Sequence, residues 1–494
     1  MDVENCIVTT NLQGGIAVAG VNGDWWGSPP GVVTVRNNVF AGNSSPYGSN
    51  PGSGIGCGGT ATITGNTFMG NTAVNWGSGW NGSGGVYCSG NAIITDNTFV
   101  NNSNNAAGSS AIYCQAAATI TGNTFNLNLG GWSGCVYCGD TAIIVSNTFT
   151  GNSGSSCSSA ALIAGNSFVG NFSSGHGGAI SCYGSPTTII GNMFTGNTAS
   201  GGFGGGAFCA YIPSGNTPVG AATVSSNMFV LNSAQTGGGL YIGGLSVILQ
   251  GNLVINNSQT SASSQGGGVW VNATSNLFMI NNTIFGNTAA GSGGGAAFQV
   301  NGTVELLNIY NNIIWGNSAN GNGGDVWLAG TGQEKVFDNN DVNNMYGVWD
   351  IAQNLLNVDP QFFNAVGGDY HLQSTSPCRN AGTNGAPSLP LTDLDGNLRT
   401  NALGQVDLGC YEFNTTATHP ADTNATFVIT PGEYAAYAAA WKAGQTWTNA
   451  PSSAPNPNPI PANYVTRAGY LMTNGGAYYN NGSARPTNWR PLGQ

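Results

Sequence analysis

Pairs of asparagines five residues apart recur along most of this chain, and their spacing constrains the fold more than any other feature. The segment Ile63–Asn71 has the sequence ITGNTFMGN, and this motif recurs with small changes in later units. The steps between first members of successive pairs range from 19 to 35 residues. A repeat of this period is typical of a solenoid, in which each unit buries its apolar face by stacking on its neighbours. Pairs that carry this prediction include Asn66 with Asn71, Asn97 with Asn102, Asn123 with Asn128, and Asn192 with Asn197.

The repeat units have the pattern of strands. Apolar residues alternate or come in short runs, as in Ala61–Thr64 and Ala92–Thr95, and Gly or Asn bounds these runs. The 80 glycines favour tight turns over helices. Parallel turns stack about 4.8 Å apart, so asparagines at equivalent positions can pass side-chain amide hydrogen bonds from rung to rung. We therefore predict an all-β fold, a right-handed parallel β-helix solenoid of about twelve rungs over residues 1–345, with stacked phenylalanines beside the asparagine ladder.

A column of cysteines accompanies the asparagines. Cys57, Cys88 and Cys114 each lie nine residues before a first-member asparagine, and Cys138 and Cys157 follow the same rule. Cys182 lies ten residues before, and later rungs carry Ile242 and Val271 at the corresponding place. Exchange with Ile and Val indicates small buried hydrophobes. Disulfides between adjacent rungs and metal binding are the alternatives, although straight stacking leaves the Cβ atoms rather far apart for a disulfide.

Charged residues are almost absent from the repeat. Asp140 is the one Asp, Glu, Lys or Arg between residues 97 and 304, and no basic residue lies between Arg36 and Lys335. The net charge of −11 argues against nucleic acid as a partner, and no apolar run is long enough for a transmembrane helix. Acid–base catalysis needs at least two positioned titratable groups, but the carboxylates are scattered over many rungs and His176 stands alone. The sequence therefore predicts a protein without enzymatic activity.

Beyond about Tyr346 the repeat pattern ends. The sequence there contains the segments Asn357–Phe362, Gly368–Leu372 and Val406–Glu412. Together with the Asn-Thr-Phe-x-Gly-Asn rungs, these segments resemble right-handed parallel β-helix proteins of bacterial cell surfaces, the polymorphic outer-membrane and pectate-lyase-like repeat group. The resemblance covers residues 1 to about 413. It implies a β-helix end or cap over residues 346–415 and an extracellular or cell-surface location. A disulfide between Cys378 and Cys410, closing this cap, would fit that location. Because the scaffold carries adhesins, enzymes and structural proteins alike, the resemblance leaves function open.

The tail, residues 416–494, contains a segment with the layout of a calcium loop. Oxygen atoms fall at positions one, three, five, seven, nine and twelve, and a short helix follows. The six residues are Asp422, Asn424, Thr426, Val428 (through its carbonyl), Thr430 and Glu433. This arrangement resembles half of a dockerin-type repeat, but Phe427 replaces the turn glycine and Thr426 replaces an acid. Calcium is one interpretation, and a metal-free helix start capped by Thr430 is the other.

We expect a non-catalytic extracellular structural protein, a subunit of a surface fibre. The N-terminal segment around Asn5–Ile7 has the pattern of a mid-solenoid rung, so an uncapped first rung is expected to pair head-to-tail with the C-terminal region of another copy. The alternative is an adhesin or glycan-binding protein, which an aligned exposed row of tryptophans would favour. A polysaccharide lyase or hydrolase is the least favoured. In the loops, Asn81 and Asn301 lie in glycosylation sequons, whereas ladder asparagines in sequons should stay unmodified.

Overall fold

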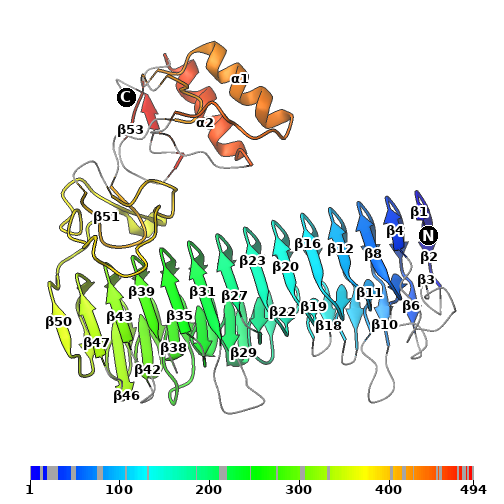
Figure 1. The fold of residues 1–494 in the computed structure, drawn as a ribbon, viewed down its shortest axis with the longest axis horizontal. Coiled ribbons are helices and arrows are strands. Elements are labelled where there is room, and N and C mark those ends of the chain that lie inside the picture. Colours follow the sequence, from blue (N-terminus) through cyan, green and yellow to red (C-terminus); the bar gives the residue numbers. More distant parts are fainter. Residues whose placement is uncertain are drawn as a thin grey trace.

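The computed structural model describes residues 2–11, 15–18, 32–45, 52–74, 82–105, 108–130, 133–184, 186–210, 220–244, 246–273, 276–300, 306–330, 334–400, 404–413, 419–424, 426, 428–451, 454, 459–475, 478–480, 485, 486 and 489–491. Most of these residues form a rod of stacked parallel strands, with β1 and β50 at its two ends (Figure 1). The predicted β-solenoid is confirmed. Its three main sheets hold 14, 13 and 13 strands in the described part of the chain, slightly more than the rungs expected.

The first sheet contributes one strand from every rung. Its strands, in spatial order, are β1 (Asp2–Glu4), β4 (Val32–Arg36), β8 (Thr60–Thr64), β12 (Ala92–Thr95), β16 (Ala118–Thr121), β20 (Ala142–Val145), β23 (Ala161–Ala164), β27 (Thr187–Ile190), β31 (Ala221–Ser225), β35 (Ser246–Gln250), β39 (Leu277–Ile280), β43 (Leu306–Tyr310), β47 (Glu334–Asp338) and β50 (Ile351–Gln353). Its inward column runs in register through Val35, Ile63, Ile94 and Ile120, all fully buried.

The second sheet follows the first around each turn. Its strands are β2 (Ile7–Thr9), β5 (Val39–Ala41), β9 (Thr67–Met69), β13 (Thr98–Val100), β17 (Thr124–Asn126), β21 (Thr148–Thr150), β24 (Ser167–Val169), β28 (Met193–Thr195), β32 (Met228–Val230), β36 (Leu253–Ile255), β40 (Thr283–Phe285), β44 (Ile313–Trp315) and β48 (Asp341–Val342). The predicted phenylalanine stack is confirmed on its inner face, with ring centroids 4.5–4.9 Å apart from Phe40 to Phe229.

The third sheet completes the turn. Its strands are β3 (Ile16–Val18), β7 (Ile55–Cys57), β11 (Val86–Cys88), β15 (Ile112–Cys114), β19 (Val136–Cys138), β22 (Ser155–Cys157), β26 (Ile180–Cys182), β30 (Ala207–Ala210), β34 (Leu240–Gly243), β38 (Val269–Ala273), β42 (Ala296–Val300), β46 (Val326–Gly330) and β49 (Met345–Tyr346). Cys57 to Cys209 stack in register as buried free thiols, and Ile242 and Val271 continue the column, as predicted.

Two shorter sheets lie between the second and third sheets. One contains β6 (Ser44–Ser45), β10 (Thr72–Ala73), β14 (Ser103–Asn104) and β18 (Leu129–Gly130). The other contains β25 (Phe172–Ser173), β29 (Thr198–Phe203), β33 (Ser233–Thr236), β37 (Ser258–Gln259), β41 (Thr288–Ala289) and β45 (Ser318–Ala319). No strand of either sheet comes from the rung between them, where Ser153 makes only an isolated bridge to Phe172.

The asparagines form two continuous ladders at the corners of the solenoid. Asn123 is typical: its Oδ1 accepts from the backbone N–H and the Nδ2 of Asn97, at 2.9 and 3.0 Å. Its Nδ2 donates to Asn147 Oδ1 and to the carbonyl oxygen of Ile94, at 3.0 and 2.8 Å. The residue before a ladder asparagine often has left-handed backbone, as Gly122 does with a φ of 69°, which explains the recurring Gly-Asn dipeptide. The ladder prediction is confirmed.

The last rungs taper. Trp349 packs on Phe337, with ring centroids 4.8 Å apart, at the end of the hydrophobic core. The solenoid strands continue to Gln353, a few residues beyond the boundary predicted at residue 345. The second ladder ends on a carboxylate, because Asp325 Oδ1 accepts from Asn317 Nδ2 at 2.9 Å in place of another asparagine.

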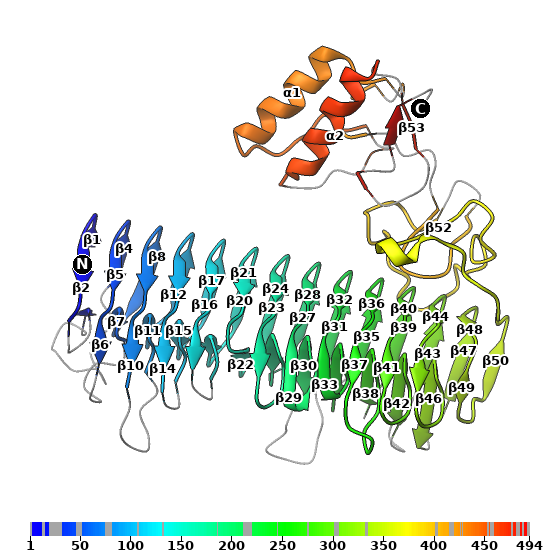
Figure 2. The same cartoon turned by 180° about the vertical axis from the view of Figure 1, so that it is seen from behind.

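Residues 357–413, the lateral domain, pack against the side of the rod rather than over its end (Figure 2). Their apolar side chains cover the outer face of β36 and β44 through Leu253, Ile255 and Ile313. The regular elements of this domain are β51 (Phe362–Asn364), a 3-10 helix (Ala365–Gly367) and β52 (Asp369–Leu372).

The tail module has a hydrophobic core of its own. It contains α1 (Pro431–Lys442), α2 (Ala462–Thr473), β53 (Tyr478–Asn480) and β54 (Trp489–Pro491). The two helices pack around Tyr437, Leu471 and Trp489. The predicted short helix is α1, and the segment after the Pro-rich stretch forms the second helix.

Candidate functional site

Aromatic side chains form an outer column on the third sheet. The middle residues of successive strands are in register through Tyr87, Tyr113 and Tyr137, and again from Phe208 through Tyr241 to Trp270. Neighbouring rings in these runs are stacked, with centroids 4.6–5.7 Å apart. Because side chains alternate along a strand, this column lies opposite the buried cysteines. We call it the aromatic column.

Two serines interrupt the aromatic column. Ser156 and Ser181 occupy the positions between Tyr137 and Phe208. The interruption coincides with the shortest step of the repeat, 19 residues between Asn147 and Asn166, where the rung contributes no strand to either short sheet. Loss of the rings and of the strand together leaves a notch in the wall of the rod.

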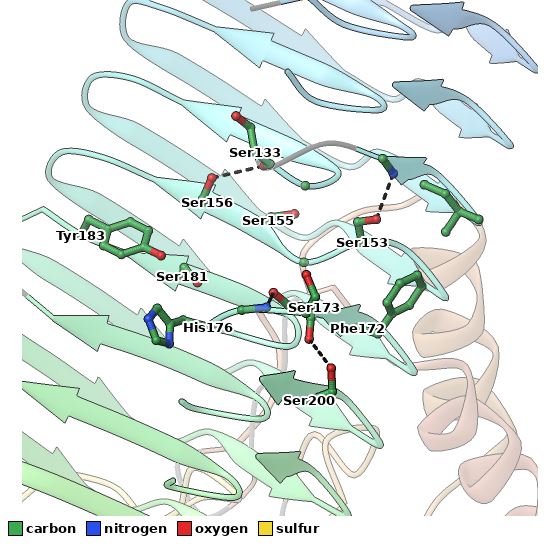
Figure 3. Close-up of a pocket in the computed structure, with 16 residues that line it drawn as sticks. Ser133, Ser153, Ser155, Ser156, Phe172, Ser173, His176, Ser181, Tyr183 and Ser200 are labelled. Atoms are coloured by element: carbon green, nitrogen blue, oxygen red, sulfur yellow. Dashed lines mark hydrogen bonds between the residues drawn. The ribbon is translucent and has the colours of Figure 1, made fainter. Parts of the chain in front are cut away.

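The notch is a groove of about 680 Å³ lined by Gly and Ser with a few larger side chains. Figure 3 shows Phe172 on one side, His176 and Tyr183 on the other, and the serines between them. No Asp, Glu, Lys or Arg is among its described lining residues. This volume lies within the range of small-molecule sites.

Hydrogen bonds to the backbone determine whether each serine hydroxyl of the groove keeps its O–H donor or its oxygen lone pairs available for a ligand. Ser153 and Ser173 accept from the backbone N–H groups of Gly130 and Gly175, at 3.0 and 3.1 Å. Ser156 instead donates to the carbonyl oxygen of Ser133 at 3.2 Å. A hydroxyl has one donor and two acceptor positions, so the groove offers both O–H donors and free lone pairs.

The His176 ring is fixed at the edge of the groove by a hydrogen bond and by stacking. Its Nδ1 accepts from the backbone N–H of Phe203 at 3.1 Å, and its ring stacks on Phe203 and Phe208 with centroids 4.6 and 4.7 Å apart. Burial lowers the pKa of His176. These contacts leave the imidazole as an aromatic wall rather than a base paired with a carboxylate.

The titratable groups gather instead in the lateral domain, buried and paired. His371 lies between Asp369 and Asp395, at 2.7 and 3.0 Å. Arg399, 1% exposed, donates to Glu412 Oε1 at 3.0 Å and to two backbone carbonyls. Arg485 of the tail module contacts Asp395 at 3.6 Å and so joins the tail to this network. Each of these side chains therefore has a partner of opposite formal charge in the lateral domain or in the tail module.

The expected disulfide between Cys378 and Cys410 is not formed. Both residues are buried free thiols. Each faces the rod: the thiol of Cys378 donates to Asp341 at 3.3 Å, and the backbone N–H of Cys410 donates to Thr283 at 3.0 Å. Docking of the lateral domain on the solenoid therefore takes the place of an internal bridge. Cys135, which directly precedes β19, is also buried in the core.

The calcium-like segment starts helix α1. Thr430 and Glu433 form a reciprocal capping box, in which Glu433 Oε2 accepts from the Thr430 backbone N–H at 2.9 Å. Asp422 Oδ2 accepts instead from the Tyr478 hydroxyl at 2.6 Å. Asn424, Thr426 and Val428 complete the predicted set, and the Thr426 backbone N–H donates to Asp422 Oδ1. This geometry is that of the metal-free helix start, and calcium stays a prediction. No cluster of three His, Cys, Asp or Glu suited to a metal occurs in the described residues.

Other predicted positions have mixed outcomes. Asn81 and Asn301 lie outside the described residues, and so do Trp76, Trp80 and Trp132, three tryptophans that a glycan-binding row could have used. The ladder asparagines in sequons, Asn43, Asn171 and Asn282, are buried. Trp270 belongs to the aromatic column and Trp315 packs against the lateral domain, so neither is part of an exposed tryptophan row.

The groove was missed by sequence reasoning, yet the sequence carries two signals of it. The residue before each column cysteine is Tyr87, Tyr113 and Tyr137, then Ser156 and Ser181, and then Phe208. The second signal is the 19-residue step at the same place. A small polar residue in an aromatic column, beside a shortened turn, indicates a depression in the wall of a solenoid.

None of the helices in the described part of the chain is long and apolar enough to cross a membrane. A scan against protein-family models and searches of curated proteins and of solved structures gave no match to this chain.

Proposed function

We propose that this protein is a non-catalytic structural rod displayed outside the cell. The observation that carries the proposal is the pair of asparagine ladders, whose side-chain amide bonds run unbroken from Asn38 to Asn340 and from Asn11 to Asp325. A buried amide network that is satisfied on every rung stiffens the solenoid without charge. Stiffness and length are the properties that a surface rod requires.

An extracellular setting is supported by the scarcity of cleavage sites for trypsin-like proteases. The chain offers no Lys or Arg between Arg36 and Lys335, so trypsin-like proteases have no cleavage site in most of the rod. The described lining of the groove adds no charged group, and Asp395 and Glu412 of the lateral domain are paired with His371, Arg399 and Arg485. Acid–base catalysis needs a pair of free titratable groups, so catalysis is not part of the proposed function.

Self-assembly is a second element of the proposal, favoured by the last rung. Among the described strands, β50 pairs with β47 on one side only, and its three residues are exposed. Tyr346 and Val348 beside it are 50% and 79% exposed. An unpaired strand edge is a template for a strand of another copy, and a contact of that heterologous kind propagates into a filament.

Negative-stain electron microscopy of the native material tests this proposal. We expect filaments built from rods of roughly 60 Å, the length of about thirteen rung spacings. Ile351→Lys, which places a charge on the β50 edge, should give isolated rods, whereas the matched substitution Val358→Lys on the lateral domain should leave filaments intact. Isolated rods in the unaltered protein would rule out assembly, and a flexible or globular particle would rule out the rod itself.

A further inference from the structure

We propose that the groove at the short rung binds a neutral saccharide. This site goes beyond the structural role proposed above and does not depend on assembly. It rests on three features of the groove: its preset hydroxyls, a further serine hydroxyl without a partner among the described residues, and the apolar side chains on its walls.

The hydroxyls of the groove match a ligand that is itself rich in hydroxyls. Ser153 and Ser173 accept from backbone N–H groups and keep an O–H to donate, whereas Ser156 and Ser200 donate to backbone carbonyls and keep lone pairs to accept. Sugar hydroxyls also donate and accept at once, so they can pair with both kinds of serine. The roles of these serines are set before any ligand enters, which lowers the entropic cost of binding.

Ser155 adds a hydroxyl that the described residues leave available. It lines the groove among the other serines (Figure 3), and no described residue makes a hydrogen bond with its side chain. Its hydroxyl is not one of those sealed in the interior without a partner, as those of Ser53 and Ser109 are, so it can donate to and accept from a ligand in the groove.

The walls of the groove supply apolar surface. Phe172 is 48% exposed and Leu129 is 43% exposed, although both are large hydrophobic residues on strands of the short sheets. Across the serines lie the rings of His176 and Tyr183 (Figure 3). A saccharide presents C–H faces as well as hydroxyls, and it can place these faces on the rings while its edge contacts the serines.

Other ligand classes fit less well. The absence of any charged residue among the described lining residues gives no attraction for phosphate, nucleic acid or an acidic polymer. The floor strands β19, β22 and β26 are internal strands of the third sheet, so they offer no free edge to an extended peptide. A purely apolar ligand would leave the serine hydroxyls unpaired. A neutral polyhydroxylated ligand satisfies all three constraints.

Titration calorimetry of the full chain against hexasaccharides tests the site. The probes are the hexamers of glucose, mannose, xylose and N-acetylglucosamine, with hexagalacturonate as the charged counterpart. We expect at least one neutral hexamer to bind at one site per chain and hexagalacturonate not to bind. Failure of every neutral hexamer to bind, or equal binding of hexagalacturonate, would overturn the proposal.

Two variants assign binding to the groove. Ser156→Tyr continues the column of Tyr87, Tyr113 and Tyr137 across the notch and should weaken binding at least about tenfold while the protein stays folded. Thr188→Tyr, on the outer face of the first sheet, is the matched control and should leave affinity unchanged. Equal affinity of Ser156→Tyr and the unaltered protein would place the ligand elsewhere and refute the site.

Ser155→Ala separates a ligand-binding role from a structural one. Because no described residue makes a hydrogen bond with this hydroxyl, we expect an unchanged unfolding midpoint together with several-fold weaker saccharide binding. A lowered midpoint with unchanged affinity would show that Ser155 serves the fold and would remove this residue from the site.

Discussion

The solenoid and the lateral domain satisfy buried polar groups in opposite ways. In the solenoid, uncharged side-chain amides pair with one another, because each ladder asparagine accepts a hydrogen bond from the rung before it and donates one to the rung after it. In the lateral domain, buried polar groups are satisfied by ion pairs such as Arg399 with Glu412. A periodic fold can reuse one residue that both donates and accepts, whereas a domain without a repeat must build a separate partner for each group.

Asp325 is the point at which the two strategies meet. All amide bonds of the second ladder donate in one direction, so its last donor, Asn317, needs an acceptor from outside the series of asparagines. The carboxylate of Asp325 supplies it, and it also accepts from the backbone N–H groups of Asn343 and Asn344. Burial raises the pKa of Asp325. The ladder therefore ends where the first interior carboxylate of the rod appears.

The largest effect is expected from breaking an ion pair of the lateral domain. Arg399→Met removes the donor to Glu412 Oε1 and to the carbonyl oxygens of Gly409 and Cys410, and losing this buried pair with its hydrogen bonds should cost about 3–5 kcal/mol. Hydrogen exchange measured by mass spectrometry should show lost protection over residues 393–412 and unchanged protection over residues 92–128. Arg399→Met combined with Glu412→Leu should restore part of the loss. Equal loss in both segments would show that the two regions are one cooperative unit.

A slightly smaller effect is expected within the ladder. Asn123→Ala removes the acceptor of Asn97 and a donor to Ile94, and should lower the free energy of unfolding by about 3 kcal/mol. Asn126→Ala, three residues away on the outer face, is the matched control and should stay within about 0.5 kcal/mol. Urea denaturation measures both. Similar values for the two variants would contradict a structural role for the ladder amides.

Alkaline pH should separate the two regions. Burial acts to lower the pKa of His371, but Asp369 and Asp395 more than offset this and raise it to about 9. Because the folded pKa exceeds the unfolded value of about 6.5, the stabilisation is complete below pH 6.5 and declines as pH rises through 9, by about 3 kcal/mol in the lateral domain. The solenoid has Asp140 as its one Asp, Glu, Lys or Arg between residues 97 and 304, and the thiols of its cysteine column are buried, so it should keep its exchange protection over this range. Loss of protection in the solenoid would refute the contrast.

The smallest effect is expected from the exposed ion pair of the first rungs. Arg36 and Glu4 lie 2.7 Å apart, but their side chains are 51% and 37% exposed. Solvent screening leaves such a pair worth less than about 1 kcal/mol, and added salt reduces it further. Arg36→Gln should therefore shift the unfolding midpoint only marginally. A shift as large as that of Asn123→Ala would mean that surface charge, rather than the ladder, stabilises this end.

The parts of the fold that repeat could be predicted from sequence, and the parts that do not repeat could not. The stacked positions of Asn66, Phe68 and Cys57 could be predicted, because equivalent residues of every rung lie in register and have the same surroundings. The lateral domain docks through contacts such as Asn281 with Asp407, 126 residues apart, which no local pattern encodes. The groove could not be predicted from the repeat, because it forms where the aromatic column is interrupted by Ser156 and Ser181. A repeat pattern describes the residues that recur and not the positions at which they are replaced.

Backbone hydrogen exchange of the ladder asparagines tests the central claim most directly. Each backbone N–H of the first ladder, from Asn38 to Asn312, donates to the side-chain oxygen of the next rung. We predict slow exchange over residues 92–128. The protection there, after correction for the intrinsic pH dependence of amide exchange, should change neither with salt nor at alkaline pH. Exchange near the rate of an unfolded chain, or protection that collapses in high salt, would show that the uncharged amide ladders do not hold the rod together.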